Sequence, residues 1–254
     1  MAGLHPKNHY FDFLAGWYDR LLDNEGLDIE YYSKAIGSKS RKVLELACGT
    51  GRLIIPLIKS GHAVDGIDIS PDMLRICREK LKRENLDANL YEQDIVSFNI
   101  DRTYDDIFIA GGSFCMISDI DEALQCLTGI IDHLNPGGRL IMDLFNPLES
   151  HKNDDEKIPK VIRTAAEGNK KVVCYALTDM DVYEQILKGS YKYELFIDDV
   201  LQNELIDEFV MRWYGKYEFK LLLEKAGFSN INIEPGTIMS SHSGTLVYHA
   251  QKPK

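Results

Sequence analysis

The segment VLELACGTGR, Val43 to Arg52, joins a short apolar run to a turn that contains two glycines. Gly49 and Gly51 follow a run that is typical of a buried strand, and parallel sheets bind ligands beyond the carboxyl ends of their strands. A glycine at such a place lets the backbone come close to a ligand that a Cβ atom would exclude. We interpret this turn as one wall of a nucleotide-binding site.

An acidic residue lies about twenty positions further along, in the segment VDGIDIS. Asp68 stands at the end of the second predicted strand, where a carboxylate can accept hydrogen bonds from both hydroxyl groups of a ribose. The glycine turn together with this acid predicts an adenosine-binding site more strongly than either feature does alone.

Two residues near the turn bear on which adenosine cofactor binds. The nicotinamide pattern G-x-G-x-x-G/A ends in a small residue, whereas Ile54 occupies that position here. Glu45 lies within the first strand, where a carboxylate repels a pyrophosphate and favours a cationic amine. Ile54 therefore argues against a dinucleotide, and Glu45 favours a ligand that carries positive charge, while the strand-turn geometry by itself leaves the cofactor open.

The elements that position these residues alternate in type. Strand-like and helical runs follow one another from Val43 to Phe145, a pattern typical of parallel β-α units. Ser70 and Pro71 predict the start of a helix directly after the second strand. The expected strands are Val43–Leu46, Ala63–Ile69, Asn89–Asp94, Asp106–Ala110 and Arg139–Phe145, with the turn Asn135–Gly138 ending the helix before the fifth strand.

The pattern changes after the fifth strand. His151–Lys160 is polar and contains a proline, and we interpret it as a linker or loop. Glu184–Asp198 alternates between apolar and polar residues, which predicts an antiparallel strand with one exposed face. The remaining expected elements are flanking strands at Lys171–Leu177 and Glu204–Tyr214, a helix that ends at Gly227, and strands at Ile231–Glu234 and Thr245–Gln251.

Composition limits the classes of function. The chain has 254 residues and a formal net charge of -11, which argues against a broad electrostatic grip on nucleic acid. Its five cysteines form no CxxC pair, as suits free thiols in a reducing compartment, and no stretch is apolar enough to span a bilayer. The histidines lack metal-binding spacing. We expect a cytoplasmic protein without a nucleic-acid partner, a membrane partner or a metal site.

From roughly Tyr18 to the C-terminus the sequence resembles the class I S-adenosylmethionine-dependent methyltransferases. VLELACGTGR is similar to the first motif of that family, VDGIDISPDML to the second, EQDI to the third, and LNPGGRLIMDLF to the helix-turn-strand that closes the core. The resemblance implies an α/β fold with a Rossmann-like, seven-stranded, mostly parallel sheet whose last strand is reversed, plus an inserted antiparallel sheet. It also implies S-adenosyl-L-methionine as the cofactor.

The resemblance further implies a set of cofactor-binding residues. The first motif would contact the methionine part, Asp68 the ribose, and Ile69 with Met73 the adenine. Tyr18 would either contact the cofactor from an N-terminal helix or pack that helix in place. The full implied set is Tyr18, Glu45, Ala47, Gly49, Thr50, Gly51, Arg52, Asp68, Ile69, Met73, Asp94, Ile95, Gly111 and Ser113.

The acceptor is indicated less directly. The segment AGGS stands where relatives that methylate the amino groups of bases or glutamine carry (D/N)PPY, which disfavours a nucleic-acid amine. The inserted sheet resembles the one that small-molecule N-methyltransferases fold over their acceptor, so the implied acceptor is a small molecule methylated at nitrogen rather than oxygen. We identify no catalytic residue, because alignment alone can supply much of the rate. Candidate acceptor contacts are Phe114, Phe145, Asn146, Arg212, Trp213 and Tyr214.

We expect three parts in the chain. These are an N-terminal helical cap at residues 1–40, a Rossmann-like cofactor-binding core at 41–150 and 216–254, and an inserted antiparallel β lid at 151–215. An apolar sheet face also fits an oligomer interface, so the insertion either covers the acceptor or forms a possible homodimer. Alternative functions are a protein side-chain methyltransferase, a nicotinamide-dependent oxidoreductase and a cofactor-binding scaffold without turnover.

Overall fold

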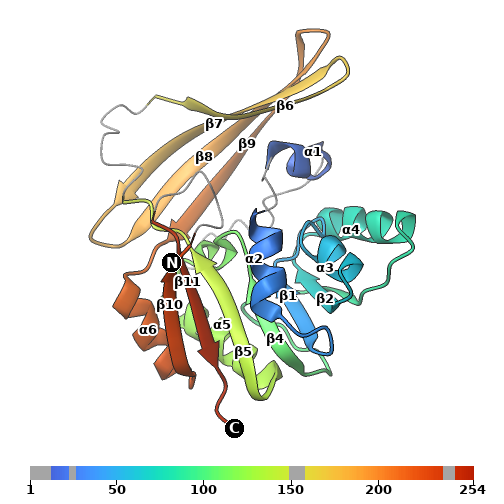
Figure 1. The fold of residues 1–254 in the computed structure, drawn as a ribbon. Coiled ribbons are helices and arrows are strands. Elements are labelled where there is room, and N and C mark those ends of the chain that lie inside the picture. Colours follow the sequence, from blue (N-terminus) through green and yellow to red (C-terminus); the bar gives the residue numbers. More distant parts are fainter. Residues whose placement is uncertain (1–12, 23–26, 149–157, 237–243) are drawn as a thin grey trace.

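The computed structural model describes residues 13–22, 27–148, 158–236 and 244–254. Within them the chain forms two separate sheets (Figure 1). The larger sheet has seven strands in the order β10-β11-β5-β4-β1-β2-β3, and the smaller has four strands in the order β6-β7-β8-β9. No helix among these residues is long and apolar enough to cross a membrane.

The larger sheet has the predicted class of topology. Its parallel strands are β1 (Lys42–Leu46), β2 (Ala63–Asp68), β3 (Leu90–Glu92), β4 (Tyr104–Ile109) and β5 (Leu134–Leu144). The last strand, β11 (Leu246–Gln251), runs antiparallel to β5, and β10 (Ser229–Pro235) runs antiparallel to β11. The expectation of a mostly parallel seven-stranded sheet with a reversed last strand is therefore confirmed.

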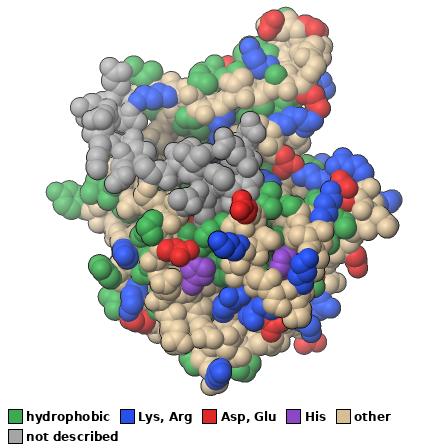
Figure 2. Space-filling view, in the orientation of Figure 1, with side chains coloured by type: hydrophobic (Ala, Val, Ile, Leu, Met, Phe, Trp, Pro, Cys, Tyr) green, Lys and Arg blue, Asp and Glu red, His purple; other side chains and the backbone are tan. Residues whose placement is uncertain are grey.

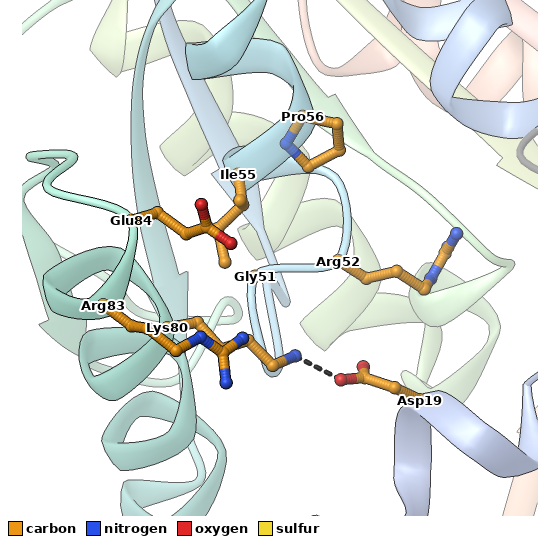
Figure 3. A pocket seen from close by; sticks show the side chains of 8 residues that line it. All are labelled: Asp19, Gly51, Arg52, Ile55, Pro56, Lys80, Arg83 and Glu84. Atoms are coloured by element: carbon orange, nitrogen blue, oxygen red, sulfur yellow. Dashed lines mark hydrogen bonds and ion pairs between the residues drawn. The ribbon is translucent and has the colours of Figure 1, made fainter.

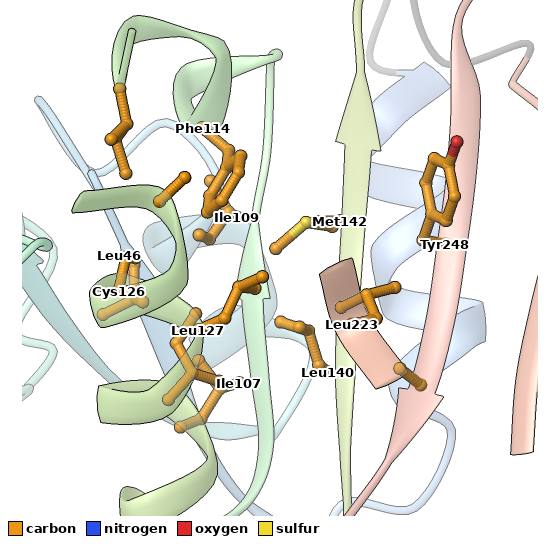
Figure 4. Packing of buried hydrophobic residues seen from close by; sticks show 14 of the residues in the cluster. Leu46, Ile107, Ile109, Phe114, Cys126, Leu127, Leu140, Met142, Leu223 and Tyr248 are labelled. Atoms are coloured by element: carbon orange, nitrogen blue, oxygen red, sulfur yellow. The ribbon is translucent and has the colours of Figure 1, made fainter. Parts of the chain in front are cut away.

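Helices cover both faces of this sheet. One face packs against α2 (Leu27–Ile36), α3 (Ile54–Lys59) and α4 (Pro71–Arg83), and the other against α5 (Ile120–His133) and α6 (Lys216–Lys225). Figure 4 shows Leu127 of α5 and Leu223 of α6 packing toward Leu140 of β5. Burial on both sides explains why the central strands are continuous apolar runs in the sequence.

Two local predictions about helix ends can be compared with the structure. Ser70 accepts a hydrogen bond on its Oγ from the Met73 N–H at 3.3 Å and so begins α4 as predicted. By contrast, β5 begins at Leu134 and includes the segment that we expected to be a turn before Arg139. Tyr104 pairs with Leu134, and a register irregularity in β4 between Tyr104 and Asp106 allows the strand to extend through the glycines.

The four-stranded antiparallel sheet is here called the lid. It consists of β6 (Lys160–Glu167), β7 (Lys170–Asp181), β8 (Ile186–Ile197) and β9 (Val200–Arg212). Three of these strands were predicted and β6 was not, because an exposed Val161 and a register shift before Arg163 interrupt its alternation. Most of the predicted linker His151–Lys160 lies outside the described residues, and Lys160 itself begins β6.

The lid contacts the rest of the molecule at two places. Helix α1 (Phe13–Leu21) packs Leu14 and Trp17 against Val172 and Tyr193 on the inner face of the lid. At the other end, Trp213 follows β9 and packs between the lid and the loops at the carboxyl edge of the larger sheet. The lid thus projects beyond that edge, and the visible face of the molecule carries acidic and basic side chains interspersed (Figures 1 and 2).

Candidate functional site

The glycine turn connects β1 to α3 at the carboxyl edge of the larger sheet. Ala47, Gly49 and Gly51 all have positive φ angles, of 57°, 54° and 79°. A Cβ atom on Gly49 would meet Tyr18 Cε1 at 4.0 Å and no other described neighbour within that distance, whereas on Gly51 it would lie 2.5 Å from Cys77 Sγ. Gly49 therefore borders open space that a ligand can use. A side chain at Gly51 would collide with α4, and the implied contact of Gly51 with the methionine part of the cofactor stays a prediction.

Asp68 ties the end of β2 to this turn. Its Oδ2 accepts a hydrogen bond from the Gly49 N–H at 2.7 Å, and its Oδ1 accepts one from the Ser70 N–H at 2.8 Å. Burial raises the pKa of the Asp68 carboxyl, and these backbone hydrogen bonds act in the opposite direction. Each oxygen has further acceptor capacity, as ribose hydroxyls require. The neighbouring Ile69 is 37% exposed and offers apolar surface at the place predicted for adenine.

Glu45 places a buried carboxyl group in β1, close to the glycine turn. The residue is 4% exposed, and its Oε2 accepts no hydrogen bond from any residue that the structure describes. Burial raises the pKa of Glu45 well above its ordinary value, while the nearby Arg52, which forms an ion pair with Asp28 of α2, lowers it. An unsatisfied buried carboxylate oxygen is costly. It is suited to a ligand ammonium group, so this observation fits the methionine part of S-adenosylmethionine.

Helix α1 covers the turn from the lid side. Burial raises the pKa of Tyr18 to about 12, so the phenol stays neutral at physiological pH. The Thr50 hydroxyl donates to Asp19 Oδ1 at 2.5 Å, and Lys80 of α4 forms an ion pair with Asp19 (Figure 3). Lys80 also donates to the Thr50 carbonyl at 3.1 Å. These contacts fix α1 above the glycine turn.

A cleft of about 230 Å³ lies between α1, α4 and the glycine turn (Figure 3). Its lining includes Gly51 and Arg52 of the implied cofactor set but not Gly49, Asp68 or Ile69. The lining residues are Asp19, Gly51, Arg52, Ile55, Pro56, Lys80, Arg83 and Glu84.

Three further residues of the implied cofactor set lie near β2 and β3. Met73 is buried in the first turn of α4. After β3, Asp94 Oδ1 accepts a hydrogen bond from the Val96 N–H at 2.9 Å, and Ile95 packs against the main core. Their roles toward adenine stay predictions.

The turn after β4 is held by an aspartate that our sequence reasoning missed. Gly111 and Gly112 both have a φ of 69°, and their N–H groups donate to Asp143 Oδ1 at 3.0 Å and Oδ2 at 2.8 Å. The Tyr32 hydroxyl of α2 donates to Oδ1 at 2.6 Å. A carboxylate that is buried within an apolar strand must accept hydrogen bonds from nearby donors. The aspartate in the apolar segment MDLF was therefore a signal that our sequence reasoning did not use.

Two acceptor candidates are core residues. Phe114 is fully buried and packs its ring 5.9 Å from that of Tyr214. Tyr214 is 3% exposed and donates its hydroxyl to the Ile117 carbonyl at 3.4 Å. Both side chains pack against Phe219 of α6. Both side chains therefore belong to the core, and their contacts with an acceptor stay predictions.

The other acceptor candidates lie where the lid meets the core. Arg212 Nε donates to the Ser118 carbonyl at 2.7 Å, and Trp213, which is 3% exposed, packs with Leu187 and Phe209 of the lid. Phe145 is half-buried beneath that cluster, and Asn146 Oδ1 accepts from the Leu148 N–H at 3.0 Å. Ser113 donates to the Ala110 carbonyl at 2.9 Å. Contacts of Arg212, Trp213, Phe145 and Asn146 with an acceptor stay predictions, as does the implied contact of Ser113 with the cofactor.

The inner face of the lid carries polar residues that the sequence did not single out. Asp207 of β9 is 6% exposed and pairs with Tyr191 of β8, whose ring stacks on Phe209 at 4.4 Å. Burial raises the pKa of both Tyr191 and Tyr18, and the nearby Arg163 of β6 acts in the opposite direction on each. Asp207 lies two residues from both Leu205 and Phe209, so all three side chains lie on one face of β9. A charged residue on this otherwise apolar face was the signal available in the sequence.

Comparison with known proteins identifies relatives for this arrangement. The model of a family described as "Methyltransferase domain" matches residues 43–138. A putative methyltransferase of Geobacillus sp. (strain WCH70) is 26% identical over 54% of this chain and 58% of its own length. A demethylmenaquinone methyltransferase of Tropheryma whipplei (strain Twist) is 30% identical over 74% of this chain and 66% of its own length. The chain therefore spans about six tenths of the length of these relatives.

A solved structure extends the likeness to the whole chain. The sugar N-methyltransferase KedS8 from Streptoalloteichus sp ATCC 53650 superposes with a TM-score of 0.76 and 17% sequence identity. The superposition covers 100% of this chain and 98% of that one. At this level of identity the likeness concerns the fold, and it includes the region of the lid.

Proposed function

Since the chain belongs to the class I S-adenosylmethionine-dependent methyltransferases, we propose that it transfers a methyl group to a nitrogen atom of a small molecule. The acceptor binds between the inner face of the lid and the carboxyl edge of the larger sheet. The observation that carries this proposal is the buried Asp207 on the inner face of the lid, together with Arg163 on the same sheet.

The chain has residues suited to each part of the cofactor. Asp68 offers its carboxylate to the ribose, Glu45 its buried Oε2 to the ammonium group, and Ile69 an apolar surface to the adenine. Tyr18 covers the glycine turn and helps to exclude water. When bound, S-adenosylmethionine supplies a methyl group that its sulfonium already activates.

The residues of the lid support an amine acceptor. Asp207 and Arg163 place charged groups among the aromatic side chains of the inner face, and such a surface suits an acceptor that is polar and forms hydrogen bonds. Tyr191 and Phe209 present a stacked aromatic pair next to it. We propose that these groups orient the acceptor nitrogen and exclude water, since orientation alone can contribute about 7–11 kcal/mol to the rate.

The fold of KedS8 supports the same acceptor class. That protein is a sugar N-methyltransferase by its title, and its fold matches this chain along its whole length. The demethylmenaquinone methyltransferase among the relatives acts on a different small molecule. A small acceptor is common to both names, and Asp207 favours nitrogen as the acceptor atom.

The proposal can be tested with methyl-labelled S-adenosylmethionine. The purified protein is incubated with a panel of amino sugars, other small amines, matched alcohols and a protein extract, and the labelled product is identified by mass spectrometry. We expect label on an amine and a KM for that amine at least about tenfold higher in Asp207→Asn, because a charge-assisted contact is lost. The matched control is Glu208→Gln, a neighbouring exposed acid.

The same assay distinguishes the alternatives. Label in the protein fraction alone would favour a protein methyltransferase. Label on an alcohol or a carbon atom would overturn the choice of nitrogen. Cofactor binding without transfer to any fraction would favour a scaffold without turnover.

A further inference from the structure

We propose that Asp143 is a positioning residue for methyl transfer, acting through the turn Gly111–Gly112 that it holds at the edge of the site. This inference rests on the proposed function, and it concerns a residue that does not itself contact the substrate. Asp143 is 1% exposed and lies near the end of β5, between α2 and the turn after β4.

The turn that Asp143 holds lies beside the glycine turn of the cofactor site. Strands β1 and β4 are parallel neighbours, and Leu46 pairs with Ile109 at their carboxyl ends. Ala47 follows β1 and begins the glycine turn, and Ala110 follows β4 and begins the turn Gly111–Gly112. The two turns are therefore adjacent. A displacement of the turn after β4 changes the wall against which the reactants must be aligned.

The backbone of this turn depends on the carboxylate. Gly111 and Gly112 occupy left-handed conformations in succession, which directs both of their N–H groups toward the two oxygens of Asp143. Tyr32 Oη donates to Oδ1 and also lies 3.1 Å from the Ile109 carbonyl oxygen. Three donors therefore converge on one buried carboxylate, and they connect α2 to the ends of β4 and β5.

An amide of the same size cannot replace this carboxylate. Asn has a single acceptor oxygen, and its NH₂ group can only donate. In either orientation of the amide, at least one glycine N–H would face the NH₂ group and lose its acceptor. Asp143→Asn should therefore shift the turn while it conserves the volume of the side chain.

Asp106 provides a matched control. It is also a fully buried carboxylate, on the neighbouring strand β4, but it lies at the opposite end of the sheet. Arg139 Nε donates to its Oδ1 at 2.7 Å, and Arg41 Nη2 donates to the same oxygen at 2.8 Å. Asp106→Asn therefore reports the general effect of neutralising a buried carboxylate in this sheet.

The experiment compares Asp143→Asn, Tyr32→Phe and Asp106→Asn at a temperature well below every unfolding midpoint. Steady-state kinetics give kcat and the KM of the acceptor, and calorimetry gives the affinity for S-adenosylhomocysteine. Amide hydrogen exchange reports the protection of Gly111 and Gly112 independently of activity.

For Asp143→Asn we expect kcat to fall at least about tenfold and S-adenosylhomocysteine affinity to stay within about threefold. Exchange at Gly111 and Gly112 should be faster by about tenfold or more. Tyr32→Phe removes one of the three donors to Asp143. It should lower kcat and speed glycine exchange, each by less than Asp143→Asn does. Asp106→Asn should leave kcat and this exchange unchanged.

A wild-type kcat in Asp143→Asn would overturn the proposal, as would an equal loss in Asp106→Asn. If Asp143→Asn does not fold, the proposal is tested with Tyr32→Phe instead. Wild-type values of both kcat and glycine exchange in Tyr32→Phe would then overturn the positioning role of Asp143. Failure of the wild-type protein to methylate any acceptor would instead contradict the proposed function. Unchanged glycine exchange in Asp143→Asn would then refute the role of Asp143 separately.

Discussion

At the scale of single residues, Asp68 has the most direct connection to the cofactor site. It is buried, it accepts from the Gly49 N–H, and it lies beside the exposed apolar surface of Ile69. Asp68→Ala should weaken S-adenosylhomocysteine binding by about 1.5–3 kcal/mol, or roughly ten- to a hundredfold in Kd, because charge-assisted hydrogen bonds to a ribose are lost. Isothermal titration calorimetry measures this change directly.

The control for Asp68 is Asp72→Ala, which removes the same charge from a half-exposed position in the first turn of α4. We expect its Kd to stay within about twofold of the wild type, because surface charges contribute little. Equal affinities of Asp68→Ala and the wild type would contradict the assignment of Asp68 to the ribose.

Glu45 predicts a pH dependence of cofactor binding. Burial raises the pKa of its carboxyl, so the protein without cofactor keeps this proton to a higher pH than an exposed glutamate would. A ligand cation stabilises the ionised form and so lowers the pKa. Binding should therefore release a proton, and S-adenosylmethionine affinity should rise with pH until the raised pKa is passed.

Calorimetry in two buffers of different ionisation enthalpy measures the number of protons released. Glu45→Gln should abolish both the proton release and the rise of affinity with pH. A pH profile in Glu45→Gln that matches the wild type would assign the dependence to another group.

At the scale of elements, Trp213 belongs to the junction between β9 and α6. The sequence indicated an aromatic residue that could stack on the acceptor, but the side chain is buried against Leu187 and Phe209. Trp213→Ala should therefore destabilise the protein by about 3–5 kcal/mol, as large-to-small substitutions in a core do. Denaturant unfolding measures this, with the fully exposed Tyr183→Ala as the control.

Kinetics of the same variant separate packing from direct contact. S-adenosylhomocysteine affinity should stay within about twofold, because Asp68 and Glu45 lie on other strands. Wild-type stability together with a raised KM for the acceptor would support a direct contact between Trp213 and the acceptor.

At the scale of the whole molecule, helix α1 connects the lid to the cofactor site. Arg20 forms an ion pair with Glu167 of β6, while Asp19, one residue earlier, bonds to Thr50 and Lys80 of the core. Tyr18 lies over Gly49 from the same helix. Contacts from consecutive residues of one short helix thus join the two sheets on either side of the proposed acceptor site.

Features that depend on neighbours along the chain follow from the amino-acid sequence alone. The β-α alternation, the helix start at Ser70 and the glycine turn with its spaced acid are set by periodicity, capping and backbone conformation, which are local. These features were sufficient for the fold class and for the family of the cofactor site. The motif order then added the reversed last strand.

What each side chain faces, in contrast, depends on how distant segments pack together. Gly51 is required by Cys77 of a later helix, and Asp143 is required by Gly111 and Tyr32, which lie more than thirty residues away. Phe114 and Trp213 are buried by packing between separate elements, although their sequence positions fitted an acceptor site equally well. Strand β6 was missed because an edge strand pairs on one side only and need not alternate. Such contacts depend on strand order and packing between distant segments, and hydrophobic periodicity carries no information about either.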